Sequence, residues 1–182
     1  MIFTLLRRIR LRIKDVSTIS ALCQGAEQHA LDNGEDKPGA EHFLLAALDL
    51  PDGTAKSVFA EFHVDSEAIN AAIYKQYNDA LTEVGINVDS VKLNESETKL
   101  KQRQHILYQG KPSVQTLMQE LAALRRQDKD MPLLGAHVLQ VLASREVDTV
   151  ARTLKTLNIS KQDMLKVATE ELERYRRNPE HV

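Results

Sequence analysis

Two histidines 95 positions apart are the side chains of this sequence best suited to chemistry, because an imidazole can bind a metal ion or transfer a proton near neutral pH. His42 follows Glu41, and His137 follows Ala136. No other histidine stands four positions from either one, and no cysteine accompanies them, so the spacing does not indicate a metal site. We predict that both histidines are hydrogen-bonded structural groups in the first turn of a buried helix.

Two other candidate sites lack the residues that their chemistry needs. Cys23 shares an apolar stripe with Ile19 and Leu22, which predicts a small core residue rather than a nucleophile. The segment Gly34–Gly39 has the outer glycines of a phosphate loop but not the lysine and hydroxyl that must follow them. Ala40 and Glu41 stand there instead, and a carboxylate would repel phosphate. No metalloprotease or nucleophile-elbow motif occurs. We therefore predict no catalytic residue, nucleotide, metal or cofactor, and no enzyme.

The elements that position these residues occur twice, because one apolar pattern recurs at an offset of 95 residues without a gap. Aligned segments are 19–22 with 114–117, 41–44 with 136–139, and 59–64 with 154–159. Identical residues fall at Leu22 and Leu117, His42 and His137, Leu44 and Leu139, and Thr54 and Thr149. A repeat of this period indicates that one helical unit was used twice.

Composition favours an all-α fold. The chain has 182 residues, of which 42% are hydrophobic and 27% charged, as in ordinary globular proteins. Aromatic residues are only 4%, tryptophan is absent, and glycine and proline are scarce, which favours helices over strands. The single cysteine excludes an internal disulfide and agrees with a reducing cytoplasm, the predicted location.

Helical periodicity and turn signals divide the chain into two four-helix units. The predicted helices span 17–33, 41–48, 54–62, 65–77, 112–124, 136–143, 147–157 and a last one from 160 to about 172. The predicted organisation is a basic arm or helix (1–16), a first repeat (17–77), a polar linker (78–111) with Lys99, Lys101 and Arg103, a second repeat (112–173) and a charged, frayed tail (174–182). The two repeats form one domain.

The first fourteen residues carry a charge of +5 and no acid. Basic residues interrupt every apolar run, so the segment is not a secretory signal. We predict that its apolar residues pack on the body of the protein: Leu5, Leu6, Ile9 and Ile13. The alternative is that residues 1–14 lie on anionic lipid or nucleic acid.

The sequence resembles the repeat of the N-terminal domain of the Clp family of AAA+ unfoldases. The likeness covers residues 17–172 and is carried by Ala26, His29-Ala30, the segment from Gly39 to Leu48 (GAEHFLLAAL), Thr54-Ala55 and Val64-Asp65. The second copy keeps Gly135–Leu139 and Asn158–Ser160. The resemblance implies an eight-helix bundle of two repeats related by a pseudo-twofold axis, here without the ATPase modules.

In that family the domain recruits adaptors, substrates or partner helices, and in some members the glutamate before the repeat histidine contacts phosphorylated arginine. Glu41 matches this glutamate, whereas Ala136 replaces it in the second copy and Ala40 replaces a frequent threonine. The resemblance thus implies Glu41 and Ala136 as the positions of a peptide site, with the alanine weakening a phosphoarginine site.

Three functions follow from these observations. The first is a non-catalytic module that holds a peptide or protein in a groove between the repeats and acts as an adaptor, decoy or recruitment factor. Its partner would be a substrate, an adaptor or a Clp-type ATPase. The second is a membrane- or nucleic-acid-associated protein that works through its basic N-terminal residues. The third, an enzyme, lacks any visible set of nucleophile, base or metal ligands.

Overall fold

The described part of the chain is entirely helical. The computed structural model describes residues 2–83, 111–146 and 148–178, and in these ranges it has eight helices and no strand. The helices are α1 (Ile2–Asp32), α2 (Ala40–Leu48), α3 (Thr54–Ala60), α4 (Ser66–Glu83), α5 (Pro112–Gln127), α6 (Gly135–Ser144), α7 (Thr149–Thr156) and α8 (Lys161–Arg177). The predicted all-α class is confirmed, and no described helix is long and apolar enough to cross a membrane.

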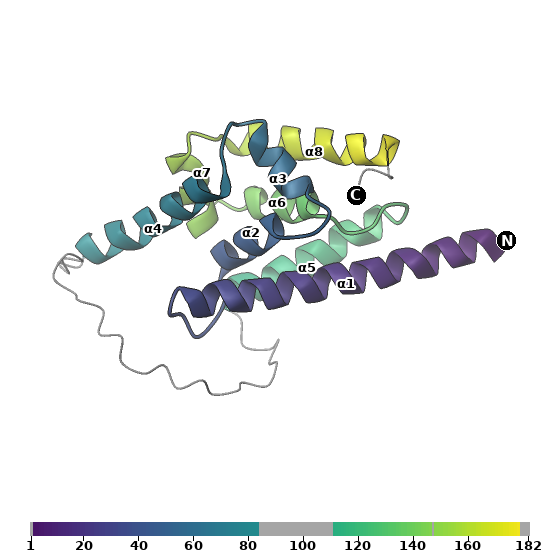
Figure 1. The fold of residues 1–182 in the computed structure, drawn as a ribbon, viewed down its shortest axis with the longest axis horizontal. Coiled ribbons are helices and arrows are strands. Elements are labelled where there is room, and N and C mark those ends of the chain that lie inside the picture. Colours follow the sequence, from purple (N-terminus) through teal and green to yellow (C-terminus); the bar gives the residue numbers. More distant parts are fainter. Residues whose placement is uncertain (1, 84–110, 147, 179–182) are drawn as a thin grey trace.

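The helices pack as two related sets of four. If α1–α4 and α5–α8 change places in order, the helix contacts map onto one another. The contact of α1 with α2 then corresponds to that of α5 with α6. The contact of α3 with α8 likewise corresponds to that of α7 with α4, and the contact of α2 with α7 to that of α6 with α3. α2 and α6 pack on each other at the centre (Figure 1). Since α3 and α4 pack on the helices of the other repeat, the two repeats share one core and form a pseudo-twofold bundle.

The two central helices are buried on all sides, as their sequences predict. Every residue of α2 is buried, and so is every residue of α6 except Gln140 and Ser144. A helix that is apolar all round can be stable only inside a core. Cys23 is also buried, and burial raises the pKa of its thiol to about 11, so the thiol is protonated and unreactive at neutral pH.

The turns before α4 and α8 share a left-handed residue at equivalent positions. His63 has φ 55° and Asn158, 95 residues later, has φ 57°. After each of them the next backbone N–H returns to a carbonyl of the preceding helix, from Val64 to Phe59 at 3.2 Å and from Ile159 to Leu154 at 2.9 Å. The duplicated sequence thus specifies the same helix stop twice, although a histidine at positive φ is less favourable than an asparagine.

The first helix differs from its prediction. α1 is one continuous helix from Ile2 to Asp32, so residues 1–16 are not separated from the first repeat by a break. The side chains of Leu6, Ile9 and Ile13 are exposed rather than packed on the body, and Ile19 is also exposed. That prediction was wrong, because an apolar stripe shows which face of a helix is apolar but not that a partner covers it. The side chain of Leu5 lies outside the described residues.

Two boundaries also lie elsewhere. α4 continues six residues into the segment assigned to the linker and ends at Glu83, while Lys99, Lys101 and Arg103 lie outside the described residues. α8 continues to Arg177, so the first part of the predicted frayed tail is helical. Arg174 stabilises this end, since its guanidinium lies 2.9 Å from Glu171 and 3.2 Å from Glu61, the residue directly after α3. Residues 179–182 lie outside the described residues.

Candidate functional site

The two repeat histidines close the N-termini of the central helices. The backbone N–H of Gly39 donates to Nδ1 of His42 at 2.9 Å, and that of Leu134 donates to Nδ1 of His137 at 3.1 Å. Each ring therefore satisfies the residue that precedes its helix, as the distal residue of a capping box does. Burial lowers the pKa of His137 to about 4 and also lowers that of His42, although Glu41 and Glu35 oppose the second shift. Both rings are thus neutral at pH 7.

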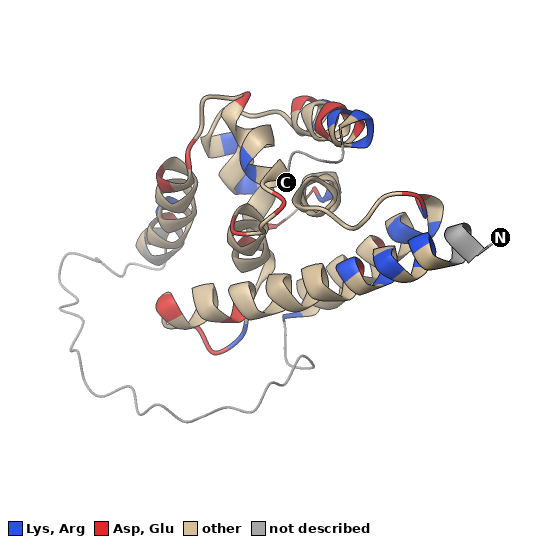
Figure 2. Cartoon of the chain, turned by 45° about the vertical axis from the view of Figure 1, so that its right-hand side comes forward, with Lys and Arg blue, Asp and Glu red and all other residues tan. Residues whose placement is uncertain are grey.

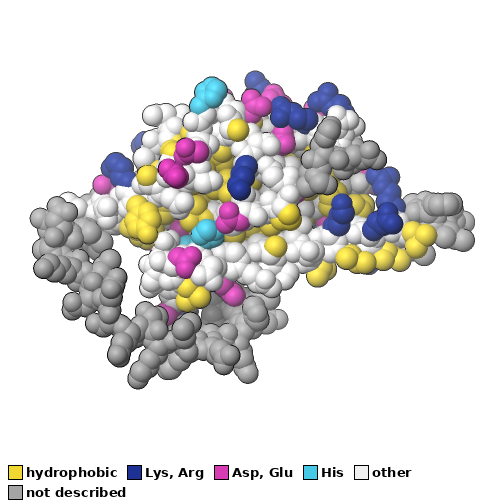
Figure 3. All heavy atoms as spheres, in the orientation of Figure 1, with side chains coloured by type: hydrophobic (Ala, Val, Ile, Leu, Met, Phe, Trp, Pro, Cys, Tyr) yellow, Lys and Arg dark blue, Asp and Glu magenta, His cyan; other side chains and the backbone are white. Residues whose placement is uncertain are grey.

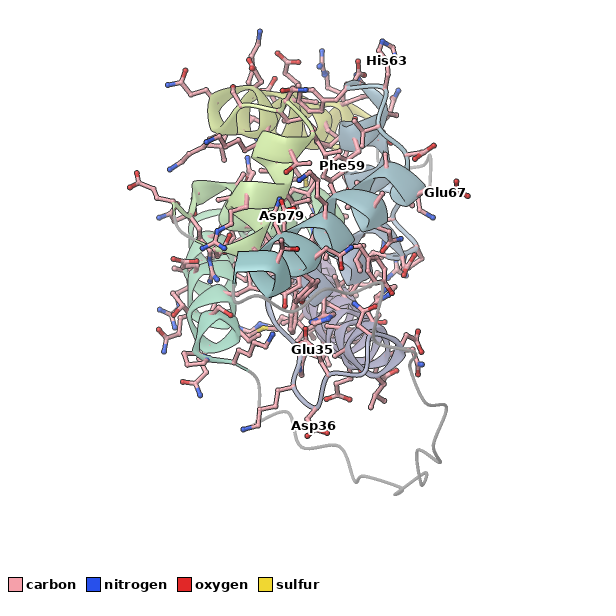
Figure 4. The ribbon with its side chains drawn as sticks, turned by 90° about the vertical axis from the view of Figure 1, so that its left-hand side faces the viewer. Glu35, Asp36, Phe59, His63, Glu67 and Asp79 are labelled. Carbon is pink, nitrogen blue, oxygen red and sulfur yellow. The ribbon has the colours of Figure 1, made fainter. Side chains whose placement is uncertain are left out.

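At the start of α2, Glu41 belongs to a closed polar cluster. Its carboxylate is 5% exposed, accepts a hydrogen bond from the Tyr77 hydroxyl at 3.0 Å, and lies 3.2 Å from Nζ of Lys111. The same ammonium lies 2.5 Å from Glu35, which points inward from the loop after α1, whereas Asp36 lies at the outer end of that loop (Figure 4). Lys111, next to the start of α5, thus ties both carboxylates of the first repeat to the second.

The contacts within this cluster favour the charged forms of Lys111 and Glu35. Burial alone would lower the pKa of Lys111, but its contacts with Glu35 and Glu41 outweigh this effect and raise it. Burial would raise the pKa of Glu35, but the hydrogen bonds from Lys111 and Tyr77 lower it. Burial and the two nearby carboxylates raise the pKa of Tyr77 far above its usual value. The lysine therefore stays protonated and Glu35 stays ionised.

Glu35, Glu41 and His42 bring three possible metal ligands together, with ligand atoms within 4.8 Å of one another. Lys111 lies between the two carboxylates, however, and Nδ1 of His42 already accepts the N–H of Gly39. The Lys111 ammonium therefore supplies the positive charge between these two carboxylates. These contacts fit a structural ion-pair cluster better than a metal centre.

The equivalent position of the second repeat is closed in a different way. Ala136 is fully buried, and its backbone N–H donates to the hydroxyl of Thr54 at 2.9 Å. The N–H of Gly135 lies 3.2 Å from both carboxylate oxygens of Asp52. The first repeat therefore caps the N-terminus of α6. Neither Glu41 nor Ala136 is open to a ligand in this structure, and each already has partners within the chain.

The residue two positions before Glu41 also differs between the repeats. A Cβ on Gly39 would come within 2.3 Å of the Glu41 carboxylate, so a larger residue at this position would make the Glu41 side chain move. In the second repeat Leu134 takes the place of Gly39 and Ala136 the place of Glu41, and both are buried. The polar cluster of one repeat is thus an apolar contact in the other.

An open hollow lies within the second repeat. It is lined by Ala143, Arg145, Glu146, Ala151, Leu154, Lys155, Asn158, Ile159, Ser160 and Lys161, from α6, α7, the start of α8 and the turns between them. Two of its lining positions carry a smaller apolar side chain than the equivalent positions of the first repeat. Ala143 stands where the first repeat has Leu48, and Leu154 stands where it has Phe59, which fills the core under α3 (Figure 4). Smaller side chains at both positions leave space that the first repeat fills.

Polar groups at this hollow are incompletely paired. Arg145, which replaces the buried Leu50 of the first repeat, lies 3.2 Å from Glu120 and 3.8 Å from Asp148. Its Nε and the Oδ2 of Asp148 are buried without a hydrogen-bond partner in the described part of the chain. Lys155 and Lys161 add two cationic groups at the rim, and the Lys161 ammonium contacts the carbonyl of Ser144 at 2.7 Å. The hollow combines an apolar floor with an edge on which the basic groups outnumber one carboxylate, Glu146, which lies 3.8 Å from the Lys161 ammonium.

Sequence reasoning missed both features for identifiable reasons. Lys111 lies at the end of a segment without periodicity, so nothing indicated that it reaches α2. Two lining positions of the hollow differ from the first repeat by conservative apolar exchanges, which leave the helical pattern intact. Comparing the repeats position by position for side-chain volume would have indicated it. The groove that was expected between the repeats has no counterpart at this hollow, which lies inside one repeat.

The duplicated histidine cap and the exchanged helix contacts point to a known repeat domain. A family model described as the Clp repeat (R) N-terminal domain matches residues 17–157. The chain belongs to this family. No curated protein matches the chain. Clp repeat domains are non-catalytic and all-helical, and they bind proteins. The match begins at Ser17, so residues 2–16 of α1 lie outside the part that matches the family.

Proposed function

We propose that the protein is a non-catalytic peptide-binding module of the Clp repeat type, and that its second repeat holds the bound segment. The hollow between α6, α7 and α8 carries this proposal, because an apolar floor bordered by polar groups is typical of a binding site. Membership of a family of protein-binding domains supports it. The cluster around Glu41 contributes to stability instead, since Lys111 and Tyr77 already bind the Glu41 carboxylate.

The chemistry of the hollow indicates which segment it accepts. Leu154 and Ile159 offer contact to one apolar side chain, and Lys155, Lys161 and Arg145 offer charge-assisted hydrogen bonds to a carboxylate. The preferred ligand is therefore a peptide with a large apolar residue next to Asp, Glu or a C-terminal carboxylate.

The binding test uses the first repeat as a template for filling the hollow. Displayed random peptides are selected on the full chain, and the enriched peptides are titrated by fluorescence anisotropy. Leu154→Phe restores the residue type of Phe59, so it should weaken binding about tenfold or more while the protein stays folded. Ala60→Lys, at the exposed position equivalent to Lys155, is the matched control and should leave affinity unchanged. Enriched peptides that bind Leu154→Phe as tightly as the original chain would contradict this site.

The biological use of such a site is to bring a bound protein to, or keep it from, a Clp-type ATPase. A degradation assay with a purified Clp ATPase and a fluorescent substrate separates these possibilities. An adaptor or recruitment factor accelerates substrate loss, and a decoy slows it in proportion to its concentration. The Leu154→Phe variant should do neither. No effect of the original chain at any concentration would limit the proposal to a partner other than the ATPase.

A further inference from the structure

An exposed apolar stripe runs along the N-terminal half of α1. Its members are Leu6 (57% exposed), Ile9 (47%), Ile13 (63%) and Val16 (68%). Spacings of three and four residues place them on one face of a helix. The opposite face contacts the body, where Asp15 lies 2.7 Å from Arg125 and the Thr18 hydroxyl donates to the carbonyl of Leu133 at 3.2 Å. The stripe therefore points directly away from the bundle, and no described residue covers it.

Basic side chains border this stripe on both sides. With 100° per residue, Arg8 and Arg12 fall on one side of it, and Arg10 and Lys14 fall on the other. The basic residues cluster at this end of α1 (Figure 2), and hydrophobic side chains follow its outer edge (Figure 3). Residues 1–14 contain no acid. An aliphatic face between two basic flanks is the pattern of a helix that lies in the plane of an anionic membrane surface.

A second copy of the chain fits this surface less well. Pairing two such helices would place Arg8, Arg10 and Arg12 of one copy beside those of the other, and like charges at flanking positions oppose association. The stripe is also short, because the positions that would continue it are Ser20 and the buried Cys23. Coiled coils need three or four sustained heptads, and this one has two. A lipid surface needs neither register nor a matching heptad, and anionic headgroups complement both basic flanks.

We propose that the N-terminal half of α1 docks on an anionic phospholipid surface, with its aliphatic stripe in the headgroup region and its arginines on the lipid phosphates. The residues that carry the stripe and the flanks precede Ser17, where the family match begins, so the surface is an addition to the shared fold. α1 continues without a break into the first repeat, so docking would hold the whole bundle at the membrane. This inference is independent of the peptide site in the second repeat.

The test measures sedimentation of the full chain with sucrose-loaded vesicles. One set contains phosphatidylcholine only, and the other contains equimolar phosphatidylcholine and phosphatidylglycerol. We expect binding to the anionic set that is about tenfold or more tighter than to the neutral set, and weaker binding as salt is added. Ile9→Gln/Ile13→Gln should reduce anionic-vesicle binding about tenfold or more, because it removes the inserted groups. Arg8→Gln/Arg10→Gln/Arg12→Gln should reduce it to the level of neutral vesicles.

Leu31→Gln is the matched control for the apolar pair. Leu31 lies on the same face of α1, is 59% exposed, and is close to Asp32 rather than to arginines, so its replacement should leave vesicle binding unchanged. The substituted side chains are exposed, so circular dichroism and thermal melting should match the original chain. Equal binding to both vesicle sets, or full anionic binding by Ile9→Gln/Ile13→Gln, would overturn the proposal. So would a dimer in light scattering that this pair abolishes, or DNA binding by a chain that ignores vesicles.

Discussion

His42 and His137 make the same hydrogen bond at the same place in two helices that pack against each other. Each Nδ1 accepts the N–H of the residue three positions earlier, at 2.9 Å and 3.1 Å. Their surroundings are nevertheless different, because the His42 side adjoins an ion-pair cluster and the His137 side adjoins the Asp52–Thr54 cap. The duplication preserved the cap that a helix start requires, while the residues around it diverged.

The buried histidines make stability depend on pH. Burial lowers the pKa of His137 in the folded protein to about 4 from its usual 6.5, so the unfolded chain binds its proton first as pH falls. Its contribution is fully present above pH 6.5, declines as pH falls towards about 4, and does not decline further below that value. The size of this effect is about 3 kcal/mol in the free energy of unfolding. The lowered pKa values of His42 and Glu35 act in the same direction.

The measurement is urea unfolding near neutral pH and at about pH 4.5. His137→Asn keeps an acceptor for the Leu134 N–H but cannot titrate, so it should lower stability at neutral pH and lose less than the original chain on acidification. His63→Asn is the control, because His63 is exposed, and it places the residue of Asn158 in the equivalent left-handed turn. Its acid dependence should equal that of the original chain. If His137→Asn and the original chain lose the same free energy, His137 is not the titrating group.

Sequence alone predicted the helices and the duplication, because both leave periodic signals. The fixed offset located α2 and α6, and their continuous apolar runs predicted burial, as observed. The first predicted helix ends at residue 33, and α1 ends at Asp32 with Gly34 at φ 73°. Turn residues and apolar periods depend on near neighbours in the chain, so they can be read without tertiary information.

Contacts between distant segments could not be predicted in this way. Nothing near Lys111 indicates that it reaches Glu41 and Glu35, 70 and 76 positions earlier. The stripe of Leu6, Ile9 and Ile13 has the same period whether a core or only solvent covers it, so its exposure was predicted wrongly. Glu41 and Ala136 were proposed as ligand positions from a family resemblance, and the proposal of a ligand there remains untested.

Removal of the Lys111 ammonium should destabilise the protein, because the buried Glu41 carboxylate then loses its counter-ion. The buried carboxylate of Glu41 contacts both Lys111 and Tyr77. Lys111→Met leaves this carboxylate without a cation and should cost about 1–3 kcal/mol in the free energy of unfolding. Glu41→Gln should cost less, because the amide still accepts the Tyr77 hydrogen bond.

A double-mutant cycle of these two changes gives the coupling free energy. Lys111→Met/Glu41→Gln should be more stable than the sum of the single changes predicts, by about 1 kcal/mol or more. Lys75→Met supplies the comparison, since Lys75 forms an exposed ion pair with Asp79 at 2.6 Å and should cost at most about 0.5 kcal/mol. Additive effects of Lys111→Met and Glu41→Gln would show that Lys111 and Glu41 have no net interaction with each other.

Gly135 lies at a close approach between the repeats, and its replacement by alanine should destabilise the protein. A Cβ there would lie 2.9 Å from Cβ of Ala55, 3.1 Å from the carbonyl oxygen of Ala47 and 3.2 Å from the backbone N of Ala55. Two of these atoms belong to backbone, so the contact cannot be relieved by a side-chain rotation. Alanine has the higher helix propensity by about 1 kcal/mol, and overpacking of the interface costs about 1–3 kcal/mol. The net change in the free energy of unfolding is therefore a loss.

The position equivalent to Gly135 in the first repeat allows a comparison of how the two repeats pack. Ala40 stands there and is buried, so the family scaffold accepts a methyl group at this position of one repeat but not of the other. Ala40→Gly should also destabilise, by about 1 kcal/mol, because it removes a buried methyl group and adds backbone entropy. Gly135→Ala/Ala55→Gly should lose less than the sum of its single changes, since Ala55→Gly removes the closest contact. Urea unfolding of these variants checks all three expectations, and a stabilised Gly135→Ala would show that α6 does not approach α2 and α3 this closely.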